Sequence, residues 1–167
     1  MQSKDINDTL LNLAGEYAAT LERVAGESLV AIVLFGSVAR REATPYSDID
    51  LLIVAEKLPQ GRFARQEWLQ AAENLLEPKR RSLYKEGMLT DFCPIIKTPE
   101  EARQITPFYL DFVEDAVILY ERDGFFSAVL EKLRQSLSRL GARRMRLGKI
   151  RYWELKPDYV PGEIFEL

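Results

Sequence analysis

The chain has 167 residues, of which 47% are hydrophobic and 29% are charged, and its formal net charge at pH 7 is −3. This length predicts one domain around a single core, and no run approaches the roughly 18–20 apolar residues of a membrane span. There is no histidine and only one cysteine, which excludes Ser-His-Asp triads, Cys-His pairs and zinc sites, and leaves oxygen ligands for a hard ion such as Mg²⁺ or Mn²⁺.

The same composition predicts the cellular compartment. The N-terminus, MQSKDINDTL, lacks the basic region and apolar stretch of a secretory signal. Cys93 is the single cysteine, so an intrachain disulfide is impossible, which fits a reducing compartment. We therefore expect a cytoplasmic protein with no membrane segment.

The first half of the chain predicts two long helices and two buried strands. Apolar residues recur at spacings of three and four up to Gly26, which is typical of an amphipathic helix. The continuous apolar runs at 29–35 and 49–54 have the length of strands that are covered on both faces. A second helix is expected after Gly61, and Pro78 is expected to close it.

The second half begins with two shorter strands and a capped helix. Residues 88–96 indicate a third strand, and Pro94 marks an edge or a bulge because proline has no N–H to donate. Residues 98–101, TPEE, have the pattern of a capping box with proline at the first helical position. Residues 107–115 are expected to be helical, and residues 116–120 to form a short fourth strand.

A long helix and a tail complete the chain. We expect Asp123 to cap this helix and Gly141 or Gly148 to end it. Residues 151–167 show no regular period, contain two prolines and a glycine, and are expected to form an extended tail. Its aromatic residues suit packing on the domain, on a partner or on a second copy of the chain; they are Tyr152, Trp153, Tyr159 and Phe165.

The charge is unevenly distributed along the chain. The segment from Lys132 to Lys156 holds nine basic residues and one acid, which gives it a charge of +8 and leaves −11 on the rest. Such an arm suits an anionic partner or the acidic face of its own domain, and a solvated helix face is the alternative. The shorter cluster Lys79-Arg80-Arg81 follows the expected end of a helix, where cations commonly pair with the helix dipole.

Two carboxylates stand at the start of the second buried strand. Strand side chains alternate, so Asp48 and Asp50 point to one side while Ile49 points to the core. Carboxylates this close repel each other, and each is driven toward protonation unless a cation lies between them. The pattern therefore favours a site for a divalent ion.

A glycine and a serine stand where the first buried strand ends. Gly36 lets a bound group approach the backbone, and Ser37 can donate its hydroxyl to a phosphate oxygen. Arg40 lies one helical turn later, where its guanidinium could neutralise phosphate oxygens. Phosphate-binding and metal-binding groups thus face one pocket, as phosphoryl or nucleotidyl transfer requires.

Residues 36–54, GSVARREATPYSDIDLLIV, resemble the signature of the DNA polymerase β-like nucleotidyltransferase superfamily. The matching residues are Gly36, Ser37, Arg40, Ser47, Asp48 and Asp50. That family has a third carboxylate on a neighbouring strand, for which Asp91 in LTDFCPII is the best match and Glu86 and Asp111 are fallbacks. Size and layout look most like the minimal nucleotidyltransferases, and the resemblance covers roughly residues 5–122.

The resemblance implies a fold and a mechanism. The fold is an α/β (α+β) domain with a small mixed β-sheet flanked by helices, like the polymerase β palm, at residues 1–122, and residues 123–167 pack on it or on a partner. Asp48 and Asp50 would bridge two Mg²⁺ ions, with Mn²⁺ as the alternative, and Asp91 would hold the ion that activates the acceptor. An acceptor oxygen would then attack the α-phosphate of ATP or another nucleoside triphosphate, and pyrophosphate would leave.

The resemblance also implies that Gly36, Ser37, Arg40 and Ser47 bind the nucleotide, but it does not name the acceptor. Minimal nucleotidyltransferases often act with a small helical HEPN protein in toxin–antitoxin pairs, which favours transfer of AMP to such a partner. The alternatives are a small-molecule acceptor, as in aminoglycoside nucleotidyltransferases, and a non-catalytic protein that only binds nucleotide. Nucleic-acid binding by the basic arm stays open but is not favoured.

Overall fold

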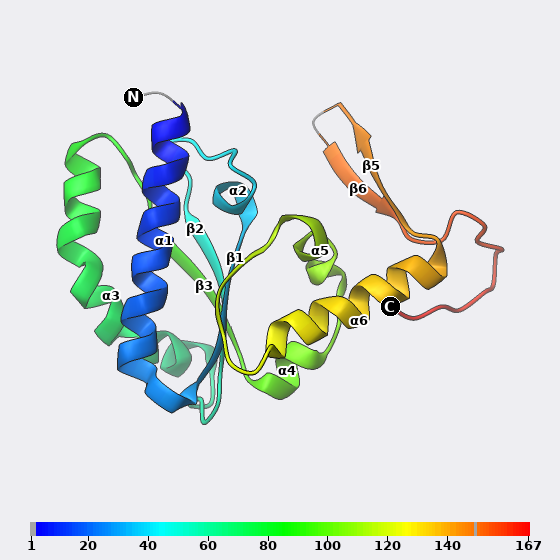
Figure 1. Ribbon diagram of the computed structural model, residues 1–167, viewed down its shortest axis with the longest axis horizontal. Coiled ribbons are helices and arrows are strands. Elements are labelled where there is room, and N and C mark those ends of the chain that lie inside the picture. The colour runs from blue at the N-terminus through cyan, green and yellow to red at the C-terminus, as the bar shows by residue number, and fades with distance from the viewer. Residues whose placement is uncertain (1–2, 149) are drawn as a thin grey trace.

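The computed structural model describes residues 3–148 and 150–167, so Lys149 of the basic segment lies outside the described residues. The molecule has a β-sheet between two sets of helices and a separate hairpin near the C-terminus (Figure 1). In chain order the elements are α1 (Ser3–Ala25), η1 (Gly26–Ser28), β1 (Leu29–Phe35), α2 (Gly36–Ala39), β2 (Ile49–Ala55), α3 (Arg62–Lys85), β3 (Phe92–Lys97), α4 (Pro99–Arg103), η2 (Pro107–Tyr109), α5 (Phe112–Asp115), β4 (Val117–Glu121), α6 (Phe125–Leu140), β5 (Arg143–Leu147) and β6 (Ile150–Glu154). None of the helices in the described part of the chain has the length and hydropathy to cross a membrane.

The central sheet is mixed and has the strand order β3-β2-β1-β4. β1 pairs antiparallel with β2 and with β4, whereas β2 pairs parallel with β3. The central strands β1 and β2 are the two continuous apolar runs, and nearly every residue in them is buried because helices cover both faces. The predicted α/β class with a small mixed sheet is therefore confirmed, as is the edge position of the strand that contains Pro94.

Helices divide the core into two halves, one on each face of the sheet (Figure 1). α1 and α3 cover the face to which Leu51 and Ile53 point. η2, α5 and α6 cover the opposite face, to which Leu52 and Val54 point. Because side chains alternate along a strand, Asp50 shares the face of α5 and α6.

Pro78 does not close its helix, contrary to the prediction. α3 continues to Lys85, and Leu76 and Leu83 on either side of the proline are buried in the core. Their burial offsets the missing backbone hydrogen bond and the ring clash, which together cost about 3 kcal/mol. The basic cluster that begins at Lys79 therefore lies within the helix rather than beyond its end.

The C-terminal helix α6 ends at Gly141, as predicted, where φ is 68°. Its start differs from the prediction, because Gly124 rather than Asp123 occupies the N-cap position. Glu121 satisfies the free N–H groups instead, since its Oε2 accepts two of them from the first turn at 3.1 and 2.9 Å. A carboxylate from the preceding strand thus replaces a local cap.

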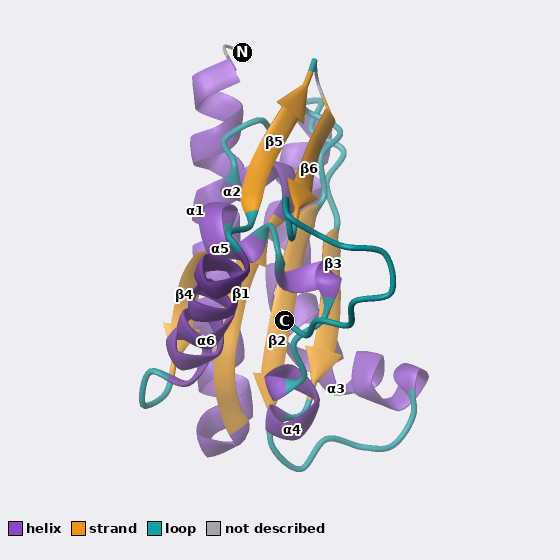
Figure 2. Ribbon diagram, turned by 90° about the vertical axis from the view of Figure 1, so that its right-hand side faces the viewer, coloured by secondary structure: helices purple, strands orange, loops and turns teal. Residues whose placement is uncertain are grey.

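Part of the expected tail is a β-hairpin, which corrects the prediction of an extended segment. β5 and β6 pair antiparallel, with Arg144 opposite Trp153 and Met145 opposite Tyr152. The signal was present but short: polar and apolar residues alternate from Arg144 to Leu147, and Gly148 lies in the two-residue loop before β6. Trp153 packs against the α5–α6 half of the core. Residues 155–167 form no helix or strand and run away from the base of the hairpin (Figure 2).

Candidate active site

A sharp turn at the end of β1 leads directly into α2. Gly36 has a φ of 74°, a conformation that costs other residues about 1–3 kcal/mol. A Cβ at this position would overlap the carboxylate of Asp50, lying only 3.0 Å from its Cγ. The two residues approach this closely because Phe35 and Asp50 are cross-strand neighbours. Only glycine therefore fits between the end of β1 and the start of β2.

Asp48 and Asp50 flank the buried Ile49 where β2 begins. Burial raises the pKa of Asp50, and the charge of Asp48 raises it further, while Arg40 opposes the shift. The two carboxylates thus repel each other when no cation lies beside them. Carboxylate oxygens are the ligands that Mg²⁺ and Mn²⁺ prefer, so this pair fits a hard divalent ion.

Asp91 lies beside Asp48 at the same end of the sheet. Its backbone N–H donates to Oδ1 of Asp48 at 3.0 Å, and its carbonyl accepts the N–H of Ile49 at 2.8 Å. Its carboxylate, however, forms an ion pair with Arg80 of α3. Among the described residues, no three His, Cys, Asp or Glu side chains gather in a way that could hold a metal ion. The structure therefore joins Asp91 to Asp48 through the backbone and turns its carboxylate toward a cation of the protein.

The charges of all three carboxylates act on the pKa of the Cys93 thiol. Cys93 is the partner of Asp50 in the parallel register of β2 and β3. Burial raises the pKa of this thiol most, and the charges of Asp48, Asp50 and Asp91 raise it further. The three acids therefore act on one region at the end of the sheet.

Arg80 has a different partner from the expected helix dipole. It contacts Asp91 and also Glu77, one turn earlier in α3, at 2.7 Å. With Asp48 and Asp91 it lines a cavity of about 340 Å³ that also includes Tyr84. The contact between Arg80 and Asp91 joins two elements that are separate in the sequence, so no local sequence pattern could predict it.

The remaining predicted nucleotide-binding residues lie around α2. Arg40 follows this helix, and its Nε lies 3.1 Å from Oε2 of Glu42. The carbonyl of Ser37 accepts the N–H of Glu42 at 2.9 Å, which closes the loop after the helix. The hydroxyl of Ser47 accepts the N–H of Thr44 at 2.9 Å, so this serine shapes the turn before β2.

The two fallback carboxylates have other partners. Glu86 occupies the C-cap of α3, where the hydroxyl of Ser82 donates to it at 3.4 Å. Asp111 precedes α5 and accepts the indole N–H of Trp153 at 3.1 Å. Asp91 is therefore the acid that the structure places next to the pair at the start of β2.

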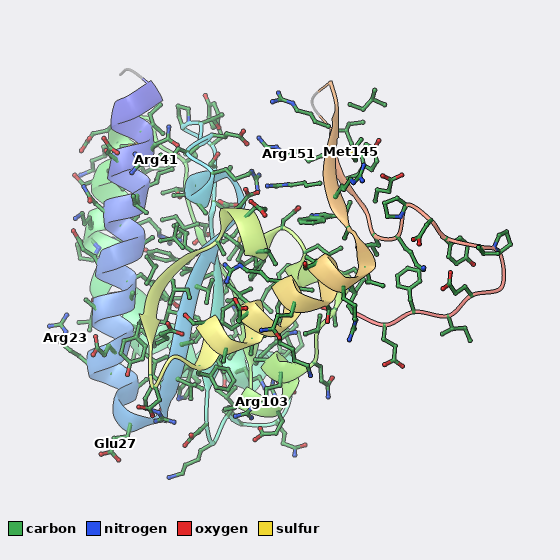
Figure 3. All side chains as sticks on the ribbon, turned by 45° about the vertical axis from the view of Figure 1, so that its right-hand side comes forward. Arg23, Glu27, Arg41, Arg103, Met145 and Arg151 are labelled. Carbon is green, nitrogen blue, oxygen red and sulfur yellow. The ribbon has the colours of Figure 1, made fainter. Side chains whose placement is uncertain are left out.

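A cavity of about 580 Å³ lies between the α2 region and the hairpin. Its lining residues are Arg40, Glu42, Asp111, Arg144, Arg146 and Arg151. Glu42 accepts from both Arg40 and Arg151, so one carboxylate links the turn after β1 to the hairpin. Figure 3 shows Arg151 directed from the hairpin toward the body of the protein.

Known proteins resemble this chain in sequence and in backbone. The profile of the nucleotidyltransferase domain family matches residues 19–166. The protein MJ1305 of Methanocaldococcus jannaschii, provisionally named a protein adenylyltransferase, is 32% identical over 133 residues, which cover 78% of this chain and 85% of that protein. A toxin–antitoxin complex with AMP-PNP aligns with a TM-score of 0.45 and 17% identity, over 76% of this chain and 92% of that chain. The MNT antitoxin complex with tri-AMPylated Shewanella oneidensis HEPN toxin aligns with a TM-score of 0.38 and 17% identity, over 78% of this chain and 92% of that chain.

Proposed function

The chain belongs to the nucleotidyltransferase domain family, and on that premise we propose that it transfers AMP from ATP to a hydroxyl group of a partner protein, with release of pyrophosphate. The observation that carries the proposal is the contact of Gly36 with Asp50, which joins the predicted phosphate-binding turn to the carboxylate pair with no room for a side chain between them. The provisional name of MJ1305, a protein adenylyltransferase, supports both AMP as the transferred group and a protein as the acceptor.

The turn after β1 forms the triphosphate-binding side of the proposed site. Gly36 leaves the backbone open to an approaching phosphate, and Ser37 offers a hydroxyl donor. Arg40 exchanges the carboxylate of Glu42 for phosphate oxygens, because its guanidinium donates equally well to either anion. Ser47 holds the turn that presents the carboxylate pair.

The carboxylates form the metal-binding side. Asp48, Asp50 and Asp91 would hold Mg²⁺, or Mn²⁺, and we propose two ions. When bound, these ions neutralise charge that develops on the phosphates during transfer. Asp91 exchanges its ion pair with Arg80 for this role, and the pKa of Asp50 returns toward its ordinary value once a cation lies beside it.

Asp91 is also the proposed base that takes the proton from the attacking hydroxyl. Its side chain is 66% exposed and lies in the cavity that Tyr84 also lines, where an acceptor can approach. The leaving pyrophosphate is held on the side of Arg40. Acceptor and leaving group thus occupy opposite ends of the path that an in-line displacement requires.

We propose a small helical HEPN protein as the acceptor, with an antitoxin role for this chain. The support is the size and layout of the chain, which look most like the minimal nucleotidyltransferases that often act with such partners. The name of the archaeal relative supports a protein as the acceptor.

Transfer of a label from ATP tests the proposal. The purified protein is incubated with Mg²⁺, a candidate HEPN protein and ATP labelled at either the α- or the γ-phosphate. We expect label on the protein acceptor from α-labelled ATP alone, release of pyrophosphate, and no transfer by Asp50→Asn. Label on a small molecule instead, or nucleotide binding without transfer by the unmodified protein, would contradict the proposal.

A further inference from the structure

The C-terminal hairpin has two chemically different faces. The outward face carries the exposed apolar residues Met145, Leu147, Ile150 and Tyr152. On the inward face Arg144 lies opposite Trp153, and Arg146 lies opposite Arg151. The inward face therefore directs three guanidinium groups at the cavity beside α2.

Two contacts fix the direction of this inward face. Arg144 forms a two-pronged ion pair with Asp115, in which Nη1 lies 2.8 Å from Oδ1 and the side chains are only 21% and 15% exposed. Trp153 donates its indole N–H to Asp111 and packs against the core. These contacts occupy Arg144 and Trp153, so neither side chain is free to bind a ligand. They hold the hairpin in a position that places Arg146 and Arg151 over the cavity.

The opposed pair Arg146 and Arg151 is unfavourable without an anion. Like charges directly opposite each other destabilise a β-ladder. Arg151 is partly neutralised by Glu42, whereas Arg146 donates to the carbonyl of Gly148 at 2.8 Å. An anion that contacts both guanidinium groups would turn this repulsion into attraction.

Glu42 marks the position at which such an anion binds. It accepts from Arg151 at 3.2 Å and from Arg40 at 3.1 Å. These hydrogen bonds, that from Arg151 first, lower the pKa of the Glu42 carboxyl. Arg40 belongs to the turn after β1 and Arg151 follows Glu42 by 109 residues, so two segments far apart in the sequence meet at one carboxylate. The surrounding cavity of about 580 Å³ has the size of a small-molecule site.

We infer that Arg146 and Arg151 bind the β- and γ-phosphates of the nucleoside triphosphate together with Arg40, in exchange for the carboxylate of Glu42. This inference rests on the proposed function and extends it by giving the C-terminal hairpin a role in substrate binding. Two adjacent phosphates offer several oxygens in the geometry that planar guanidinium groups recognise. The hairpin then distinguishes a triphosphate from a monophosphate, because AMP has no group that reaches these arginines.

Binding measurements on matched arginine variants test the inference. Affinities for ATP, inorganic tripolyphosphate and AMP are measured by calorimetry, at fixed low salt, for Arg146→Ala, Arg151→Ala and the double variant. Each charged contact contributes about tenfold in affinity, so we expect the double variant to bind ATP and tripolyphosphate roughly 100-fold more weakly and AMP unchanged. Arg143→Ala is the control, since this exposed arginine belongs to the same hairpin but does not line the cavity.

A variant with the opposite expected effect guards against loss of the hairpin structure. Glu42→Gln removes the competing carboxylate while Arg144 and Trp153 still hold the hairpin. We expect it to bind tripolyphosphate about three- to tenfold more tightly. Equal ATP affinity in the double variant and Arg143→Ala, equal loss for ATP and AMP, or weaker tripolyphosphate binding by Glu42→Gln would each overturn the inference.

The label-transfer assay separates this inference from the proposed function. If the unmodified protein transfers AMP and the double variant has the same KM for ATP as Arg143→Ala, the hairpin has no role and the proposed function stands. If the arginines bind tripolyphosphate as expected but no AMP is transferred, the proposed function is wrong and the anion site stands.

Discussion

Two regions face the same arginine-lined cavity, and they are built in different ways. The turn from Gly36 to Asp50 joins two buried central strands, and its geometry is fixed by a backbone approach that excludes any side chain. The hairpin of β5 and β6 stands outside the main sheet, and ion pairs and one tryptophan hold it in place. Figure 1 shows both regions at the same end of the molecule.

This difference in construction suggests that the buried segment mainly serves the proposed reaction and that the hairpin mainly serves ATP binding. Reacting groups must be held closely to act on a transition state, and the buried strands provide that rigidity. Charged groups on a less anchored element contribute mainly to affinity and respond to salt and pH. Variants in the turn should therefore reduce turnover, whereas variants in the hairpin should change the affinity for ATP.

Asp50→Asn should have the largest effect. We expect AMP transfer to fall by roughly 100- to 1000-fold or more, because the variant loses a proposed metal ligand at the reacting phosphate. The same variant, Asp50→Asn, should have a higher thermal stability at neutral pH.

The folded protein raises the pKa of Asp50, so the ionised carboxylate lowers the stability at neutral pH, and the neutral amide removes that cost. The gain should vanish as the pH falls below about 4, where the carboxyl is protonated in both states; a lower melting temperature at pH 7 would contradict this.

Gly36→Ala tests the rigid side by sterics alone. The positive φ should cost about 1–3 kcal/mol of stability, and the overlap with the carboxylate of Asp50 should also reduce turnover by about 100-fold or more. Gly87→Ala is the matched control, because Gly87 has a φ of 86° but no atom near its Cβ position. Urea unfolding and label transfer should show a similar backbone cost in both variants and lost activity only in Gly36→Ala. Equal activity in the two would show that the contact with Asp50 has no functional role.

Arg144→Gln should loosen the hairpin without affecting the central sheet. The variant breaks the partly buried ion pair with Asp115, which we expect to lower the free energy of hairpin opening by about 1–2 kcal/mol. Hydrogen exchange should quicken in β5 and β6 and stay constant in β1. The KM for ATP should rise about three- to tenfold with little change in kcat. A fall in kcat alone would contradict the division between the two regions.

Acid should produce the smallest effect, again in the hairpin. The hydrogen bond from Arg144 lowers the pKa of Asp115, so this pair stabilises the hairpin above the ordinary aspartate pKa of about 3.9, and the contribution is lost as the pH falls through the lowered value. We expect less than about 1 kcal/mol of weakening at pH 4. Hydrogen exchange at pH 4 and 6, corrected for the intrinsic rate, measures it. Equal weakening in Arg144→Gln would contradict this assignment.

The sequence by itself determined the elements whose signals are local. Continuous apolar runs identified both central strands, and the TPEE pattern identified the capping box at Thr98, which the structure confirms. Alternation around Ile49 also predicts that Asp48 and Asp50 share one side of the strand, and this stays a prediction. These features could be read from the sequence because each depends on residues only a few positions apart.

Only the tertiary structure decided the partners of the charged residues. The contact of Arg80 with Asp91 depends on how α3 packs against the sheet, Glu121 replaces Asp123 as the cap of α6, and Arg151 reaches Glu42 across 109 residues. Pro78 stays inside its helix because flanking leucines are buried, which no helix-breaking rule takes into account. An ion pair or a buried contact is set by distance in space, and sequence periodicity reports the shape of each element but not which elements meet.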